Sequence, residues 1–240
     1  MTEWFEEWFG EEYLRLYPHR DDRDAESVVA LIRRHAEVHG RRTLDLACGP
    51  GRHARHLLDA GASVVGFDLS PALLARARHA VGPPLRLVRG DMRALPFAPG
   101  SFGVVVNLFT SFGYFTDDDE HRRVFREIAR VLAPGGAFVI DYFNANHVRT
   151  TLVPHEEHEI GERRVATERR ISVDGRFVIK EIRMMDEGRS FLERVRLFTP
   201  EELQAMLGEA GLTVRKRFGD YDGGPIANGS PRAILLTEHH

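Results

Sequence analysis

The sequence is poor in cysteine and has no excess of positive charge. One cysteine in 240 residues excludes an internal disulfide framework and any metal site built from several cysteines. A formal net charge of -3 gives no general attraction to nucleic acid or to an anionic membrane. No apolar run approaches the roughly 20 residues that a membrane-spanning helix needs. The first residues are acidic and aromatic, unlike a signal peptide. We therefore expect a cytoplasmic protein with neither a membrane nor a nucleic-acid partner.

Short apolar runs alternate with helical stretches through the middle of the chain. Strands are expected at 43–48, 63–69, 85–91, 102–109 and 137–143, and helices at 52–61, 71–81 and 117–132. Strands that alternate with helices of this length form a parallel sheet with helices on both faces. The predicted fold class is α/β, with a doubly wound, mostly parallel, seven-stranded Rossmann-like sheet.

Other segments surround this core. Residues 3–16 and 24–38 have the pattern of amphipathic helices. Alternating polar and apolar residues at 158–173, 176–186 and 190–198 predict an inserted three-stranded antiparallel β-meander. A helix at 199–211 and strands at 212–220 and 232–238 end the chain, the helix capped by Thr199 and begun by Pro200. We expect one domain over 1–240, whose parts are an N-terminal helical lid (1–40), a cofactor-binding core (41–149), an antiparallel β insert (150–198) and a C-terminal helix and strand pair (199–240).

The segment Asp45-Leu46-Ala47-Cys48-Gly49-Pro50-Gly51 lies where the first strand meets the first core helix. Its glycines let the backbone turn sharply and approach a ligand, and the helix that follows offers free N–H groups. Asp68 comes at the end of the second strand, where a carboxylate can accept both hydroxyls of a ribose. These features predict a cofactor that contains a nucleoside.

Two cofactors are compatible with this turn. Gly49, Gly51 and Ala54 satisfy the dinucleotide pattern G-x-G-x-x-[G/A], which leaves an NAD(P)-dependent oxidoreductase as an alternative. Asp45 would repel a pyrophosphate but attract an ammonium group, and Pro50 removes an N–H from the loop. A ligand with ribose, adenine and an amino-acid ammonium fits better. S-adenosylmethionine has all three.

The motif Asp45 to Gly51 resembles the first motif of the class I S-adenosylmethionine-dependent methyltransferases, and further matches follow in order. Asp68 resembles the ribose-binding acid of the family, and Gly90-Asp91-Met92 resembles the motif that contacts adenine. By the same resemblance, Asn107 to Phe109, at the exit of the fourth strand, is expected along the methionine arm of the cofactor, and Leu132 to Gly136 resembles the turn into the fifth strand. The resemblance covers about residues 40–145. It implies S-adenosyl-L-methionine as cofactor and S-adenosyl-L-homocysteine as product.

The candidate site residues follow from the turn, the resemblance and the order of the strands. The expected cofactor-binding residues are Tyr17, Arg20, Asp45, Ala47, Cys48, Gly49, Gly51, Asp68, Leu69, Asp91, Met92, Asn107 and Phe109. The expected acceptor-pocket residues are Tyr13, Phe112, Tyr114, Tyr142 and Asn144. No metal site is expected, because His155-Glu156-Glu157-His158 lacks the H-E-x-x-H spacing.

The expected reaction is in-line methyl transfer to a nitrogen or oxygen of a small molecule. The protein then chiefly aligns donor and acceptor, so no catalytic residue is assigned. Candidate proton acceptors are Tyr17, Tyr114, Tyr142, Asp141 and His147. A small acceptor is expected because no basic target-recognition domain and no Asn/Asp-Pro-Pro-aromatic motif is present. A methyltransferase acting on RNA or protein, and a binder without catalysis, stay open, as does the choice between a monomer and a homodimer.

Overall fold

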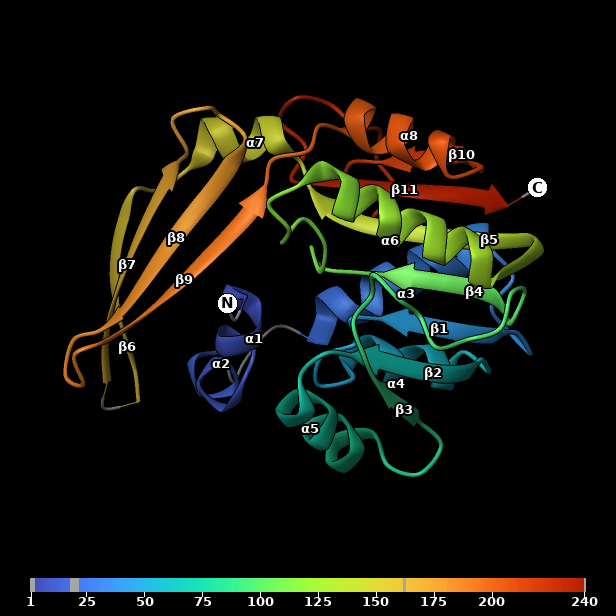
Figure 1. Cartoon of the computed structure of the whole chain (residues 1–240), viewed down its shortest axis with the longest axis horizontal. Helices are drawn as coiled ribbons and strands as arrows, with labels where there is room; N and C mark the ends of the chain where they lie inside the picture. The colour runs from blue at the N-terminus through green and yellow to red at the C-terminus, as the bar shows by residue number, and fades with distance from the viewer. Residues whose placement is uncertain (1–2, 18–21, 162, 240) are drawn as a thin grey trace.

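A seven-stranded sheet forms the centre of the computed structural model, which describes residues 3–17, 22–161 and 163–239 (Figure 1). Its strands are β1 (Arg42–Leu46), β2 (Ser63–Asp68), β3 (Arg86–Arg89), β4 (Phe102–Asn107), β5 (Leu132–Phe143), β10 (Leu212–Phe218) and β11 (Arg232–His239). The order is β10-β11-β5-β4-β1-β2-β3. β1 to β5 pair in parallel, and β11 pairs antiparallel with both β5 and β10. This confirms the predicted fold class.

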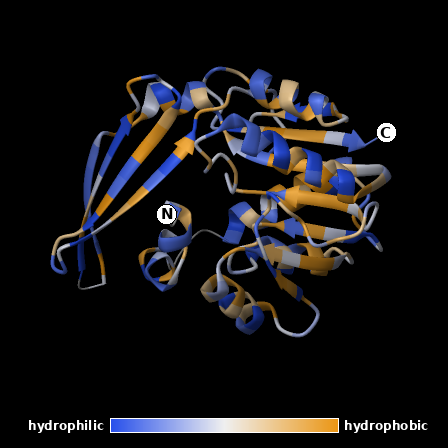
Figure 2. Cartoon of the chain, viewed as in Figure 1, coloured by the Kyte–Doolittle hydropathy of each residue, from blue (hydrophilic) through white to orange (hydrophobic). Residues whose placement is uncertain are grey.

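Helices cover both faces of this sheet. One face carries α3 (Asp22–His35), α4 (Arg52–Asp59) and α5 (Pro71–Val81), and the other carries α6 (Asp118–Val131) and α8 (Pro200–Glu209). Successive residues of β4 feed the two cores, Val104 and Val106 on one side and Val105 on the other. The strands are therefore apolar on both faces, and Figure 2 shows them as hydrophobic bands between helices with hydrophilic outer sides.

The helices begin at the residues that the sequence indicates. Ser70 accepts a hydrogen bond from the backbone N–H of Leu73 at the start of α5. At the start of α8, Thr199 and Glu202 form a reciprocal capping box, with Pro200 at the first helical position. Such caps satisfy N–H groups that lack a partner inside the helix.

The insert is a four-stranded antiparallel sheet, so the prediction of three strands was wrong. The strands are β6 (His155–Ile160), β7 (Arg163–Ile171), β8 (Phe177–Met184) and β9 (Arg189–Arg196), in that order. The predicted strand 158–173 is two strands, with Gly161 between them at a φ of +62°. β6 is exposed along most of its length, which explains why it has no apolar pattern. The short helix α7 (Ala145–Thr151), which joins β5 to this sheet, buries only Ala145 and was not predicted.

The N-terminal segment is two short helices instead of the predicted single one. α1 (Trp4–Trp8) ends before Gly10, and α2 (Glu11–Leu16) follows it. Trp8 packs with Val165 and Ile182 of the antiparallel sheet, and its Nε1 donates a hydrogen bond to Glu193 at 2.7 Å. Figure 1 shows both helices between the two sheets. None of the helices in the described ranges is both long and apolar enough to cross a membrane.

Candidate functional site

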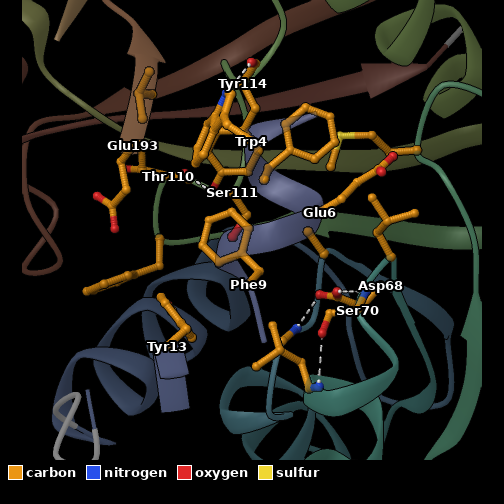
Figure 3. A pocket seen from close by; sticks show the side chains of 18 of the residues that line it. Trp4, Glu6, Phe9, Tyr13, Asp68, Ser70, Thr110, Ser111, Tyr114 and Glu193 are labelled. Carbon is orange, nitrogen blue, oxygen red and sulfur yellow. Dashed lines mark hydrogen bonds between the residues drawn. The ribbon is translucent and has the colours of Figure 1, made fainter. Parts of the chain in front are cut away.

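A cavity of about 560 Å³ opens at the C-terminal ends of the parallel strands. The ends of β1, β2, β3 and β4 line one part of it, and α1, α2 and the antiparallel sheet line the other (Figure 3). Ligands of open α/β sheets bind outside the carboxyl ends of the strands. The fold therefore brings the sequence motifs and the insert to one place.

The turn after β1 brings two glycines with left-handed backbone to the cavity. Gly49 and Gly51 have φ values of +53° and +84°. A Cβ on Gly51 would lie 3.0 Å from a methyl group of Val81 and 3.2 Å from the Cβ of Ala77, so the turn packs closely on α5. Gly49 lines the cavity.

Asp68 joins this turn to the end of β2. Its Oδ2 accepts the backbone N–H of Gly49 at 2.8 Å, and its Oδ1 accepts the backbone N–H of Ser70 at 2.8 Å. Burial raises the pKa of the Asp68 carboxyl, and these N–H groups oppose that effect. The carboxylate is thus held in one orientation at the cavity wall.

Asp45 lies behind the turn as a buried acid. Its Oδ2 has no hydrogen-bond partner among the described residues. Burial, and then the nearby carboxylate of Asp68, raise the pKa of Asp45 to about 7. A buried charge needs an opposite charge or several donors, so this acid is suited to a cationic group.

The end of β3 contributes Asp91 and Met92 to the cavity wall. Arg93 holds the Asp91 carboxylate through its Nε at 3.0 Å and its Nη2 at 2.6 Å. Burial raises the pKa of Asp91, but the Arg93 guanidinium outweighs this and holds it below its usual value. Gly90 lies so close to the Phe67 ring that a Cβ would approach it to 2.7 Å.

The far part of the cavity is aromatic. Trp4, Phe9, Tyr13 and Tyr114 line it, and Figure 3 shows their side chains gathered away from Asp68. The ring centroids of Trp4 and Phe9 each lie 5.3 Å from that of Tyr114. Glu193 adds a carboxylate.

Comparison with known proteins assigns the chain to a family. A family model described as a methyltransferase domain matches residues 43–136. The dTDP-3-amino-3,6-dideoxy-alpha-D-glucopyranose N,N-dimethyltransferase of Streptomyces fradiae is 31% identical over 220 residues, which cover 88% of this chain and 85% of that protein. The chain belongs to the S-adenosylmethionine-dependent methyltransferases.

Two further relatives are informative for this methyltransferase. The cypemycin N-terminal methyltransferase of a Streptomyces species is 29% identical over 222 residues, 88% of each chain. The solved structure of SAM-bound CalS10, an amino pentose methyltransferase from Micromonospora echinaspora, is 25% identical with a TM-score of 0.69 and covers 96% of this chain and 97% of that one. The family confirms S-adenosylmethionine as the cofactor and sets aside the NAD(P) interpretation of the glycine turn.

The structure brings many of the predicted site residues to the cavity wall. Those that line it are Tyr13, Ala47, Gly49, Asp68, Leu69, Asp91, Met92, Phe109 and Tyr114. Asp45, Cys48, Gly51 and Asn107 are buried behind this wall. The Asn107 amide donates to the carbonyl oxygens of Leu46 and Ser111. Tyr17 contacts Lys180 at the end of α2, and Arg20 lies outside the described residues.

Phe112, Tyr142 and Asn144 do not line the cavity, which corrects their placement in the acceptor pocket. Phe112 and Tyr142 are in the core between the sheet and α6, and the Tyr142 hydroxyl donates to the backbone carbonyl of Arg196. Asn144 caps α7 and donates to the carbonyl oxygen of Ala227. The predicted order of the strands placed the backbone of these three residues correctly. It could not show to which side of the sheet each side chain points.

The candidate proton acceptors divide in the same way. Burial raises the pKa of the Tyr142 phenol well above its usual value, which removes it as a base. Both oxygens of Asp141 accept hydrogen bonds within the protein. His147 is on α7 and does not line the cavity. Tyr114 is at the wall, where its hydroxyl donates to the carbonyl oxygen of Thr110 at 2.9 Å.

Sequence reasoning missed the side chains that the antiparallel sheet contributes. Val178 and Lys180 of β8, and Glu193 and Val195 of β9, all line the cavity. In the register of β8 and β9, Lys180 lies opposite Glu193 and Val178 lies opposite Val195. The Lys180 ammonium and the Glu193 carboxylate are 3.5 Å apart. Each pair on a strand is two residues apart, so period-two alternation could have placed them on one face.

Tyr142→Phe tests the correction for this residue. Loss of the buried hydroxyl leaves the Arg196 carbonyl without that donor, so the free energy of unfolding should fall by about 1–3 kcal/mol in urea denaturation. The methyl-transfer rate of the folded enzyme should stay within about twofold of wild type. A matched variant, Tyr114→Phe, alters the cavity wall and should change the kinetics. A rate loss in Tyr142→Phe at unchanged stability would contradict this placement.

Proposed function

We propose that this methyltransferase methylates the amino nitrogen of a small, sugar-like molecule. The observation that carries the proposal is the aromatic end of the cavity, formed by Trp4, Phe9, Tyr13 and Tyr114 with the carboxylate of Glu193 beside it. An amine must be neutral to attack. Removal from water lowers the pKa of an amine and favours its neutral form. Aromatic ring faces then stabilise the positive charge that develops on the nitrogen.

Nitrogen is favoured over oxygen as the acceptor. A hydroxyl acceptor benefits from a base that takes its proton. Asp141 and Tyr142 are committed to contacts inside the protein, and the Glu193 carboxylate pairs with Lys180 and accepts the indole N–H of Trp8. The relatives agree, since the enzyme of Streptomyces fradiae is an N,N-dimethyltransferase of an amino sugar and CalS10 is an amino pentose methyltransferase.

The residues around the glycine turn fit S-adenosylmethionine. Oδ2 of Asp45, which has no partner among the described residues, lies behind the cavity wall, where its charge suits the ammonium of the methionine part. The fixed carboxylate of Asp68 at the wall suits the ribose hydroxyls. Asp91, with Leu69 and Met92 at its sides, is suited to the adenine. When bound, the cofactor supplies a methyl group on a sulfonium, already activated for in-line displacement. The chain holds the cofactor and the amine in line and excludes water, which is the larger part of such catalysis.

A peptide amino terminus is the second candidate acceptor, favoured by the similarity to the cypemycin N-terminal methyltransferase. A peptide amino terminus presents the same reactive amine, but on a larger molecule. A cavity of about 560 Å³ is of the size of small-molecule sites, which span roughly 300–1,000 Å³. This volume also has to hold the cofactor, so the space left for an acceptor is smaller and favours the sugar-like molecule over a peptide.

The acceptor is tested by following methyl transfer by mass spectrometry. A nucleotide-linked amino sugar should gain one or two methyl groups, and the same sugar with its amine acetylated should gain none. A short peptide with a free amino terminus is the competing substrate. Methylation of the peptide alone, or of the acetylated sugar, would overturn the proposal.

Asp68→Ala tests the cofactor site without any acceptor. S-adenosylhomocysteine at about 100 times its Kd should stabilise the wild type by about 2.7 kcal/mol and raise its Tm by several degrees. Loss of a carboxylate that accepts hydrogen bonds should weaken binding by about 10–100-fold in calorimetry. Asp119→Ala, which removes an exposed acid on α6, should bind as wild type does. Equal affinity in wild type and Asp68→Ala would remove Asp68 from the site.

Asp45 predicts a pH dependence of cofactor binding. Its pKa of about 7 in the folded protein exceeds the roughly 3.9 of an unfolded Asp. The folded state thus holds an extra proton between these values, and the contribution of Asp45 to stability falls as the pH rises through that range. A cationic ligand group favours the ionised carboxylate, so binding below pH 7 must displace the proton.

The affinity for S-adenosylhomocysteine should therefore fall below pH 7, by up to about tenfold per pH unit, and be level above it. Asp45→Asn should bind S-adenosylhomocysteine more weakly, and its affinity should not change with pH in this range. Without ligand at pH 8, this variant should be more stable than wild type. Calorimetric titrations from pH 5.5 to pH 8 give both profiles. Parallel profiles in the two proteins would exclude Asp45 as the group responsible.

A further inference from the structure

Asp141 is a buried carboxylate of β5, next to the exit of β4. Its side chain is 0% exposed. Oδ1 accepts a hydrogen bond from Nε of Arg232 at 2.7 Å. Oδ2 accepts the backbone N–H of Phe109 at 2.9 Å and the hydroxyl of Tyr221 at 2.9 Å. With three donors on two oxygens, this carboxylate is fixed in position.

The Phe109–Thr110 turn, which follows β4, has a strained backbone. Phe109 and Thr110 have φ values of +59° and +62°. Left-handed backbone is unfavourable for an L-residue, and for a β-branched side chain such as threonine it is exceptional. Such strain persists only where the surrounding contacts enforce it, and it is concentrated at functional sites. Both residues line the cavity.

Asp141 is the residue that enforces this turn. Its side chain accepts the N–H of Phe109, and its main-chain carbonyl accepts the N–H of Thr110 at 2.9 Å. Both strained residues therefore donate to one neighbour on the adjacent strand. Thr110 in turn accepts the hydroxyl of Tyr114 through its carbonyl oxygen, which connects the turn to the aromatic end of the cavity.

Arg232 completes the arrangement from β11. Its Nη2 donates to Oγ1 of Thr110 at 3.2 Å and to the carbonyl oxygen of Asp141 at 3.3 Å. Its guanidinium lies over the ring of Phe109, 5.6 Å from the centroid. Arg232 thus neutralises the charge of Asp141 in a buried ion pair, and its guanidinium also holds the Phe109 ring in place.

We propose that Asp141 is a positioning residue for methyl transfer. It holds the Phe109–Thr110 turn, and with it the cavity wall between the cofactor motifs and the aromatic end, in the geometry that aligns donor with acceptor. In-line displacement depends on this alignment, and a misplacement of 1 Å costs about 100-fold in rate. Asp141 acts through the turn and not by contact with a substrate.

The test compares Asp141→Asn with wild type in three measurements. Asparagine retains the size of the side chain but removes its charge and replaces one acceptor with a donor. We expect kcat to fall by about 10–100-fold, while the Kd of S-adenosylhomocysteine changes by less than about threefold. The amide protons of Phe109 and Thr110 should exchange faster with solvent, while those of β1 stay protected.

Asp118→Asn is the matched control. Asp118 also pairs with arginines, since its Oδ1 is 3.2 Å from Nε of Arg196 and its Oδ2 is 2.8 Å from Nη2 of Arg176, but it does not line the cavity. This variant should lose stability and keep kcat within about twofold. Amide exchange is measured without a methyl-acceptor substrate. It therefore tests the role of Asp141 in the turn even if the enzyme does not methylate the proposed amine.

A milder variant keeps the proposal testable if Asp141→Asn does not fold. Tyr221→Phe retains the ring but removes one donor to Oδ2, and it should lower kcat by about 2–10-fold, equivalent to one hydrogen bond, with faster exchange at Phe109. The proposal is overturned if folded Asp141→Asn keeps wild-type kcat or unchanged exchange at the turn. It is also overturned if Tyr221→Phe, used in its place, changes neither quantity.

Discussion

The contact on which the site depends is the one between Asp68 and the backbone N–H of Gly49. It joins the turn after β1 to the end of β2, and these two strands pair in parallel from Arg42 opposite Ser63 to Leu46 opposite Phe67. The turn can adopt its tight path because Gly49 and Gly51 tolerate positive φ, and Asp68 then holds it there. The other motif residues that line the cavity, at the ends of β3 and β4, are positioned by the same parallel sheet.

The aromatic end of the cavity depends on a different kind of contact. Side chains of α1 and α2 pack against the antiparallel sheet through Trp8, Tyr13 and Leu16, with Val165 and Ile182 opposite them. This packing encloses the aromatic part of the cavity, while the parallel sheet carries the glycine turn and the acids at its strand ends. The division is physically reasonable, because a surface built from hairpins and short helices can change its side chains without disturbing the parallel core.

The sequence was sufficient where local chemistry determines position. The glycines of the first turn, Asp68 and Asp91 follow parallel strands, whose ends must meet at one edge of the sheet, and all of these positions proved close in space. It was insufficient where the direction of a side chain depends on tertiary packing. Tyr142 and Phe112 come from the correct segments but point into the core. β6 is exposed along most of its length and therefore lacks the apolar alternation that would have marked it as a strand separate from β7.

Buried acids show how this structure separates framework from binding site. Asp141 is enclosed and has a donor for each oxygen, so its charge is balanced and its free energy depends on the protein alone. Asp45 is equally enclosed, but among the described residues it has an oxygen without a partner, and its pKa is raised. A charge in that condition is costly in the ligand-free protein. A cationic group would reduce this cost, which is the free-energy relation that a ligand-binding acid requires and a framework acid does not.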